Sequence, residues 1–200
     1  MGSDFDSYTM YGGRRRCIVD DNGEIAAFYG ENGYNEEYSN HQVMIYQPKF
    51  YYQRIPLQTE GNRVGKIINK DSIIISPTPQ SGFKVHPLFI NADGEEVDYV
   101  LLGAYEGSIY KTVAQSTYNF VITDIDFNTD KLASNANTKP ITGTSNLTLQ
   151  RAEQLANNRG TGWHIFNLQA ESANQMLEIV EFGSLNGQSV LGKGVSQLTS

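Results

Sequence analysis

Short runs of apolar residues separated by polar residues fill the first half of the chain and predict β-strands joined by turns. Two apolar runs, residues 17–19 and 25–29, flank a polar stretch that contains Asn22 and Gly23. An Asn-Gly pair between apolar runs is a strong signal for a β-hairpin. In the next run, residues 43–52, Pro48 cannot donate a ladder hydrogen bond, so it marks a bulge, a sheet edge or a break between two strands.

Four further runs have the character of strands. Residues 64–68 and 72–76 are rich in Val and Ile, which predicts two more strands with a polar stretch between them. Residues 85–90 and 97–105 surround the stretch 91–94, which supplies Asn, Asp and Gly as turn residues. The pattern therefore predicts a second hairpin in this region.

Apolar residues recur at helical spacing near the C-terminus and predict two main helices. The first helix has Leu149, Ala152, Leu155 and Ala156 on one face, and Gly160 can end it. The second has Asn167 as a candidate N-cap, Gly183 as the left-handed stop, and on one face Ala170, Ala173, Met176, Leu177 and Val180. Strands followed by helices favour an α+β fold with several short antiparallel strands over a parallel βαβ fold.

The same pattern predicts the domain organisation. Residues 1–13 are polar and bounded by glycine, which is typical of a tail or linker. Residues 14–200 are then expected to form a single α+β domain. Residues 108–146 are rich in Ser, Thr, Asn and Asp, which predicts a long, mostly irregular insertion within that domain.

Composition excludes several classes of protein. The net charge of −7 argues against a general nucleic-acid binder, which needs cations against phosphates. One cysteine, Cys17, allows neither an intrachain disulfide nor a cysteine-based zinc site. We see no signal peptide and no apolar stretch long enough to span a bilayer, so membrane insertion is not expected. The sequence also contains no phosphate-loop motif.

One acidic run has oxygen side chains at every second position, as calcium loops do. Its members are Asp124, Asp126, Asn128 and Asp130. The EF-hand pattern also needs Gly at its sixth position and Glu at its twelfth, where this chain has Thr129 and Asn135. Two interpretations stay open, a turn-rich polar loop and a calcium site, and the polar loop is favoured. No other cofactor is expected.

Catalytic chemistry has little support in the sequence. His41, His86 and His164 are far apart, and no two of them share a helix or a close spacing. Cys17 starts a predicted strand rather than a helix, so nothing there lowers its pKa, and a small core residue is expected. A hydrolase or oxidase would need two of these side chains, or acidic residues, to converge in one cleft. We therefore predict that the chain is not an enzyme.

Residues 159–168 (RGTGWHIFNL) join the two predicted helices and hold Trp163, the only tryptophan. Gly160 and Gly162 allow a sharp turn, and the apolar residues after them can anchor it. Arg159 can reach a carbonyl or stack on a ring. A structural corner is the favoured interpretation, and a tryptophan that stacks on a ligand is the alternative.

The order of four segments resembles a family of tail-associated proteins from phages and prophages of gut bacteria. The segments are RRCIVDDNGEIAAFYG, QVMIYQPKFYYQR, GFKVHPLFINADGEEVDYVLLGAYEG and NNRGTGWHIFNLQAESANQMLEIVEFG. Residues 44–52 and 178–183 occupy the places of the strand that opens the family's domain and of the end of its later helix. The resemblance covers about residues 14–194 and implies a C-type-lectin-like fold of the formylglycine-generating-enzyme-like branch.

The chain departs from that family in two ways. The enzyme branch binds copper through a pair of cysteines, whereas this chain has only Cys17, so the resemblance does not carry that oxidase activity over. The family also continues past the second helix into a closing segment with a Gly-Asn-x-Trp motif, which is missing before Ser200. The resemblance therefore implies a fold that is incomplete at its C-terminus, and three explanations stay open: a fragment, a truncated relative, or a domain completed by another chain.

The resemblance implies a noncatalytic virion protein, made in the bacterial cytoplasm. The first functional hypothesis is a receptor-binding domain of a tail tip or fibre, which recognises a host surface glycan or protein and forms a homo-oligomer among other virion proteins. Its candidate ligand-binding residues are Tyr34, Tyr38, Tyr110, Tyr118 and Trp163. The alternative is a purely structural subunit of the virion. Exposed loop tyrosines would favour recognition, and tyrosines buried in contacts would favour assembly.

Overall fold

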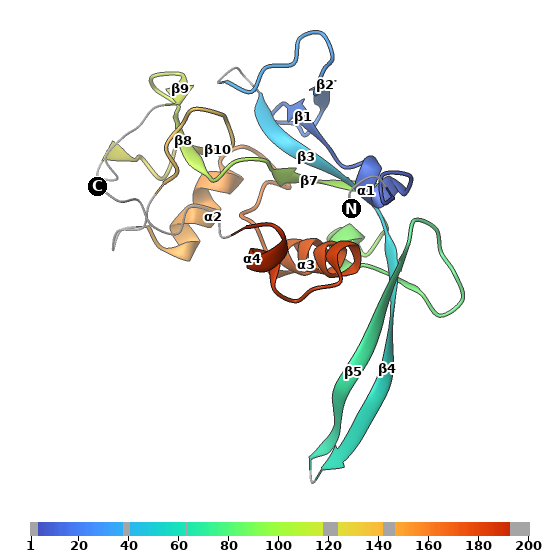
Figure 1. The fold of residues 1–200 in the computed structure, drawn as a ribbon. Coiled ribbons are helices and arrows are strands. Elements are labelled where there is room, and N and C mark those ends of the chain that lie inside the picture. Colours follow the sequence, from blue (N-terminus) through green and yellow to red (C-terminus); the bar gives the residue numbers. More distant parts are fainter. Residues whose placement is uncertain (1–3, 38–40, 63, 118–123, 142–146, 193–200) are drawn as a thin grey trace. The chain divides into compact units, whose positions relative to one another are not determined.

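The fold of the computed structural model is mixed α+β, as the sequence predicts (Figure 1). The structure describes residues 4–37, 41–62, 64–117, 124–141 and 147–192. The chain forms two compact units, each assembled from segments that are distant in the sequence. Unit 1 consists of residues 1–13, 48–100 and 168–200, and unit 2 of residues 14–47 and 101–167. The C-type-lectin-like identity of the fold stays a prediction.

Unit 1 is built on a long β-hairpin and one long helix (Figure 1). Strands β4 (Tyr51–Asn62) and β5 (Gly65–Ser76) pair antiparallel along their whole length, and β6 (Lys84–Val85) pairs with the start of β4. The helical elements of the unit are α1 (Thr9–Gly12), the 3₁₀ helix η1 (Pro87–Phe89), α3 (Leu168–Phe182) and α4 (Gly187–Val190). Helix α3 is the predicted second helix, and Gly183 ends it with a φ of +61°.

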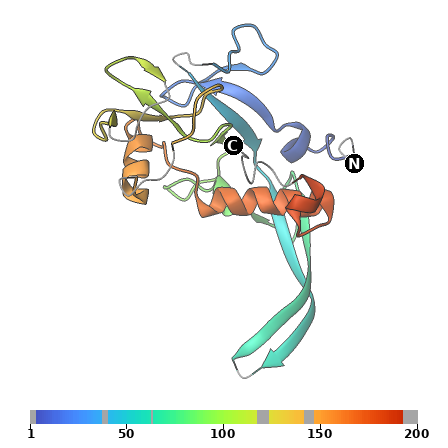
Figure 2. The same ribbon diagram turned by 60° about the vertical axis from the view of Figure 1, so that its left-hand side comes forward.

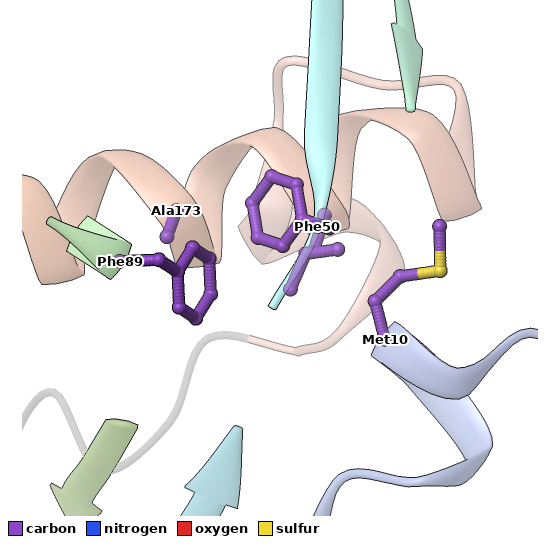
Figure 3. Packing of buried hydrophobic residues seen from close by; sticks show 5 residues of the cluster. Met10, Phe50, Phe89 and Ala173 are labelled. Carbon is purple, nitrogen blue, oxygen red and sulfur yellow. The ribbon is translucent and has the colours of Figure 1, made fainter. Parts of the chain in front are cut away.

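The core of unit 1 lies between the base of the hairpin, η1 and α3 (Figure 3). Phe50 and Phe89 are fully buried, and their rings meet edge to face with centroids 5.3 Å apart. Ala173 and Leu177 present the apolar face of α3 to these rings. Met10 completes the cluster from α1 and is only 2% exposed.

The burial of Met10 corrects the expectation that residues 1–13 are a tail. The hydroxyl of Tyr11 also donates to the Leu177 carbonyl at 3.0 Å, so α1 is tied to α3 by a polar contact as well. Burial beside Glu181 raises the pKa of Tyr11 well above its ordinary value, so this donor keeps its proton. The segment was missed because one turn of helix with a single buried side chain gives no periodic signal.

Unit 2 contains two small sheets and the other main helix (Figure 2). The strands are β1 (Arg15–Val19), β2 (Ile25–Phe28), β3 (Gln42–Pro48) and β7 (Tyr99–Gly103), in the spatial order β2-β1-β3-β7. The predicted hairpin is confirmed, since Cys17 pairs with Phe28 and Gly23 takes a φ of +83° in the turn. Of the three predicted roles of Pro48, a break between two strands is confirmed, because β3 ends there.

Residues 108–146, predicted to be mostly irregular, also contain three short strands among their described residues. Strands β8 (Ser108–Lys111), β9 (Ser116–Thr117) and β10 (Lys131–Ala133) form a sheet in the order β10-β8-β9. These strands are two to four residues long and mostly polar, so they lack a readable alternation. The apolar patch at 120–122 lies outside the described residues. Helix α2 (Leu149–Asn157) is the predicted first helix, with Thr148 as its N-cap.

Two other strand predictions are wrong in an informative way. The predicted strand 85–90 ends after Val85, because His86 caps η1: its Nδ1 accepts the Leu88 N–H at 3.2 Å, and Pro87 fits the first helical position. The predicted hairpin around 91–94 forms only the bridge between Ile90 and Glu96, and β7 pairs with β3 instead. None of the described helices has the length and apolar character needed to cross a membrane.

Replacing Met10 with Ala tests whether the N-terminal segment belongs to the core. We expect the free energy of unfolding to fall by about 2–5 kcal/mol, because the substitution removes most of a buried side chain and leaves a cavity in the core. Urea denaturation followed by circular dichroism measures this change. The control Tyr8→Ala, at an exposed position of the same segment, should change the free energy by about 0.5 kcal/mol or less. An equally small effect of Met10→Ala would return residues 1–13 to a tail.

Candidate functional site

The segment around Trp163 is a structural corner, as the sequence predicts. Gly160 and Gly162 have φ values of +148° and +88°, so the backbone turns where side chains other than glycine are disfavoured. The indole of Trp163 contacts the buried cluster of Cys17, Val19 and Met44. Its Nε1 donates to the Asp21 carbonyl at 2.8 Å. The indole N–H of Trp163 is therefore engaged within unit 2 rather than offered to a ligand.

Arg159 joins this corner to the first hairpin of unit 2. Its buried guanidinium donates to the Leu132 carbonyl and forms an ion pair with Asp21. The guanidinium carbon also lies 5.6 Å from the centroid of the Trp163 ring. Both predicted roles of Arg159, the carbonyl contact and the ring contact, are thus confirmed. Lys131 adds a second ion pair to Asp21 at 2.6 Å, so this carboxylate holds two cations against the turn of the hairpin.

A second polar cluster surrounds Glu36, close to the candidate ligand-binding residue Tyr34. The hydroxyls of Tyr34 and Tyr105 donate to its two carboxylate oxygens, at 2.8 Å and 2.5 Å. Arg16 forms an ion pair with the same carboxylate. The Tyr105 hydrogen bond is the largest of several effects that hold the pKa of Glu36 below its ordinary value. Glu36 is therefore charged at neutral pH and fixes the loop to strand β1 and to residue 105.

One exposed aromatic side chain lies beside this cluster. Tyr29 is 62% exposed, and its ring meets the Tyr34 ring edge to face with centroids 5.4 Å apart. The guanidinium carbon of Arg16 lies 4.7 Å from the Tyr29 centroid. An exposed ring held by a neighbouring ring and a cation is preorganised for stacking. Nothing in the sequence singles out Tyr29, because it falls at the end of a predicted strand rather than in a loop.

The predicted ligand-binding residues do not gather into one face. Tyr34 and Tyr110 are half-buried, and Trp163 is half-buried in the corner. The Tyr110 ring centroid lies 6.0 Å from the guanidinium carbon of Arg159, in the corner rather than beside Tyr34. Tyr38 and Tyr118 lie outside the described residues. The role of all five in ligand binding stays a prediction.

The acidic run of the weak calcium candidate forms a compact turn. The buried carboxylate of Asp130 accepts the backbone N–H groups of Thr112 and Asp126 at 3.1 Å and 2.9 Å. The Asp126 carboxylate in turn accepts the N–H of Asn128 at 3.0 Å, and the Asp124 carbonyl accepts a hydrogen bond from the Lys111 ammonium. These contacts fit the polar-loop interpretation. Across the described ranges no three His, Cys, Asp or Glu side chains are grouped as a metal site, and calcium binding stays a prediction.

The candidate catalytic residues have separate structural contacts. Cys17 is fully buried, and burial raises the pKa of its thiol to about 11. His86 is buried in unit 1, which lowers its pKa; because Nδ1 accepts a hydrogen bond, its proton lies on Nε2, 3.4 Å from the Ser172 hydroxyl. His164 pairs with Glu153 at 2.6 Å on the surface of unit 2. His41 is half-buried in unit 2.

One exposed apolar surface of unit 1 was not foreseen from the sequence. We call residues 54–73, the outer part of the β4–β5 hairpin, the arm. The arm extends beyond α3 and β6 as a bare two-stranded ribbon (Figures 1 and 2). Its apolar side chains are substantially exposed: Leu57 is 56%, Val64 95%, Ile67 49% and Ile68 45%. Because Ile67 and Ile68 are neighbours in one strand, the arm is apolar on both faces.

Two strands were predicted where β5 is continuous, and the reason is local. Residues 69–71 (Asn-Lys-Asp) resemble a turn between two apolar runs. In the structure the ladder continues through this stretch, with irregularities that leave Leu57 of β4 and Asn69 of β5 without a cross-strand partner. Strand β4 also continues through the polar residues 58–62, which gave no strand signal.

Replacing Glu36 with Gln tests the polar cluster through its pH dependence. A depressed folded pKa means that the charged carboxylate adds stability above its ordinary pKa of 4.5, and that this stability is lost as the pH falls through the folded pKa. We expect Glu36→Gln to lower the free energy of unfolding by about 1 kcal/mol at pH 7. The difference from the unsubstituted protein should shrink below pH 4.5.

Urea denaturation between pH 3 and pH 7 measures this difference for the unsubstituted protein and the variant. Glu37→Gln, an exposed neighbour, is the matched control and should show a smaller effect at every pH. A loss in Glu36→Gln that does not change with pH would show that the carboxylate charge is not what stabilises the loop.

Comparison with known proteins returned no relatives: no protein-family model, no curated protein and no solved structure matches the chain.

Proposed function

We propose that the chain is a noncatalytic structural protein of a phage or prophage particle and is held there by protein–protein contacts of its arm. The observation that carries this proposal is the exposed apolar arm. A single two-stranded hairpin is at best marginally stable in water, because neither of its faces is buried. Several large apolar side chains exposed on one element favour an interaction site. The resemblance to phage tail-associated proteins is the reason for assigning the chain to a phage or prophage particle.

The positions of Tyr34, Tyr110 and Trp163 support assembly over receptor binding. Tyr34 has its hydroxyl on Glu36, and Tyr110 and Trp163 lie in the corner around Arg159. Aromatic side chains that are already engaged inside the unit offer less surface to a glycan or protein ligand than exposed ones do. The arm, by contrast, presents apolar side chains whose burial would be favourable.

Receptor binding is the second candidate function, and one observation favours it. Tyr29 is exposed and held by Tyr34 and Arg16, which is a geometry that stacks on sugar rings or fills protein pockets. In this alternative the virion protein would bind a host surface glycan or protein through the face around Tyr29. Both functions are compatible with a homo-oligomer among other virion proteins.

Shortening the arm tests the structural function. Pro56 and Asp71 are cross-strand partners, so an Asn-Gly turn can replace residues 57–70 and close the hairpin at its base. We expect particles from the encoding phage or prophage to contain the full chain, and the shortened chain to be made in folded form but left out of the particles. Mass spectrometry of purified particles measures this, with circular dichroism as the control for folding.

Incorporation of the shortened chain at the level of the full chain would contradict a role for the arm. Absence of the full chain from purified particles would contradict the proposed function as a whole.

A glycan-array and host-cell binding assay tests the second candidate function. If receptor binding is the function, Tyr29→Ala should reduce binding by about tenfold or more, because it removes the exposed stacking surface. Tyr8→Ala, which removes another exposed tyrosine in unit 1, is the matched control and should bind normally. Equal binding by both variants would exclude the face around Tyr29.

A further inference from the structure

The arm differs in charge from the rest of the chain. Residues 54–73 contain four basic and two acidic residues, whereas the other residues contain eleven basic and twenty acidic ones. Arg54 and Asp71 neutralise each other in an ion pair at the base of the arm. Lys66 and Lys70 remain on the exposed outer part of β5, close to the exposed isoleucines. The arm is therefore both apolar and cationic, on a protein that is otherwise acidic.

Among the described residues, the densest exposed acidic stretch of unit 1 is the loop 91–98. We call it the acidic loop, and its carboxylates are Asp93, Glu95, Glu96 and Asp98. Lys49 pairs with Glu96 and Asp98 at 3.4 Å and 3.0 Å. Asp93 and Glu95 have no ion pair within the described part of the chain. Their backbone N–H groups are bound by the Asn91 side chain at 3.0 Å and 2.9 Å, which holds the loop in shape.

The prominent carboxylates of unit 2 are already engaged. Asp21 pairs with Arg159 and Lys131, Glu36 pairs with Arg16, and Asp130 is buried beside Lys111. The acidic loop therefore offers a cluster of exposed carboxylates whose charge complements that of the arm. Opposite charges that meet across an interface select the partner and set the register of the contact.

From these observations we infer that the arm binds a second copy of this chain and that Lys66 and Lys70 lie against its acidic loop. This inference rests on the proposed structural function and names the partner. The apolar side chains around Ile67 and Ile68 would be buried in the same contact, which removes the surface that the free arm exposes to water. Reciprocal exchange of arms closes a dimer, and successive exchange closes a ring.

The size and the edges of the arm fit such a contact. It contributes about 20 residues, which is the number that one side of a specific protein interface uses. Only the base of the hairpin, at Tyr51 and Tyr52, has a third strand beside it among the described residues. Pro56, Lys66 and Lys70 along the ribbon discourage edge-to-edge strand addition. The contact therefore uses the faces and charges of the arm rather than its backbone edges.

Charge reversal tests the inference on the full chain. Lys66→Glu/Lys70→Glu makes the arm acidic, and Asp93→Lys/Glu95→Lys makes the loop basic. We expect each variant alone to associate at least about tenfold more weakly than the unsubstituted protein, because like charges then meet. An equimolar mixture of the two variants should associate again, since each arm then meets a loop of opposite charge.

Sedimentation velocity at micromolar concentrations measures the association of each sample. The matched control for the loop is Asp4→Lys/Asp6→Lys, which reverses two exposed acidic residues with the same spacing in the same unit. The matched control for the arm is Lys84→Glu on β6, which is also exposed. Both controls should associate like the unsubstituted protein. Salt of about 1 M, where the Debye length is about 3 Å, should weaken association of the unsubstituted protein.

Three results would overturn the inference. Association of the unsubstituted protein that both reversals leave unchanged would remove the arm–loop contact, while the structural function would stand if the chain is still found in particles. A monomer at every concentration would show that the arm has a different partner. A monomer that binds vesicles of anionic lipid through Lys66 and Lys70 would make a membrane surface that partner.

Discussion

A two-stranded β-ribbon has no buried face of its own, and the arm of unit 1 is such a ribbon. Hydrogen bonds along the ladder satisfy the backbone between β4 and β5, but both faces of the arm stay open to water in the free chain. Stability at the base comes from Phe50, Phe89 and the apolar face of α3. Towards the tip nothing described in unit 1 continues that core, and the apolar side chains there are exposed.

Unit 2 solves a different problem with a different set of side chains. Its connections are long and polar, and acidic side chains fix them: Asp21 at the hairpin turn, Glu36 in the polar loop and Asp130 in the turn of the acidic run. Each of these carboxylates binds backbone N–H groups, hydroxyls or cations of the same unit.

The sequence predicted the elements whose signals are local. The Asn22-Gly23 hairpin and the two helices after residue 147 follow from turn chemistry and helical periodicity. It also predicted the corner, since Gly160 and Gly162 allow a sharp turn and Arg159 can reach a carbonyl. The mixed α+β class followed from the order of these elements.

The elements that the sequence did not predict depend on contacts distant in the chain. Met10 is buried because it packs in one cluster with Phe50 and residues of α3, and no periodicity around residue 10 indicates this burial. Strand β5 is predicted as two separate strands because residues 69–71 resemble a turn, and the outer part of β4 gives no strand signal because residues 58–62 are polar. The cluster around Glu36 joins residues 16, 34, 36 and 105, so it could not be assembled from spacing alone.

The central claim is that the arm becomes buried only when a partner covers it. Amide hydrogen exchange of residues 57–70 tests this most directly, when the protein is compared at concentrations where it is assembled and where it is monomeric. The account predicts fast exchange in the monomer and slow exchange in the assembly, while the amides of α3 stay protected in both. Equal exchange of the arm in the two states would contradict it, because the arm would then be either stable by itself or unused in assembly.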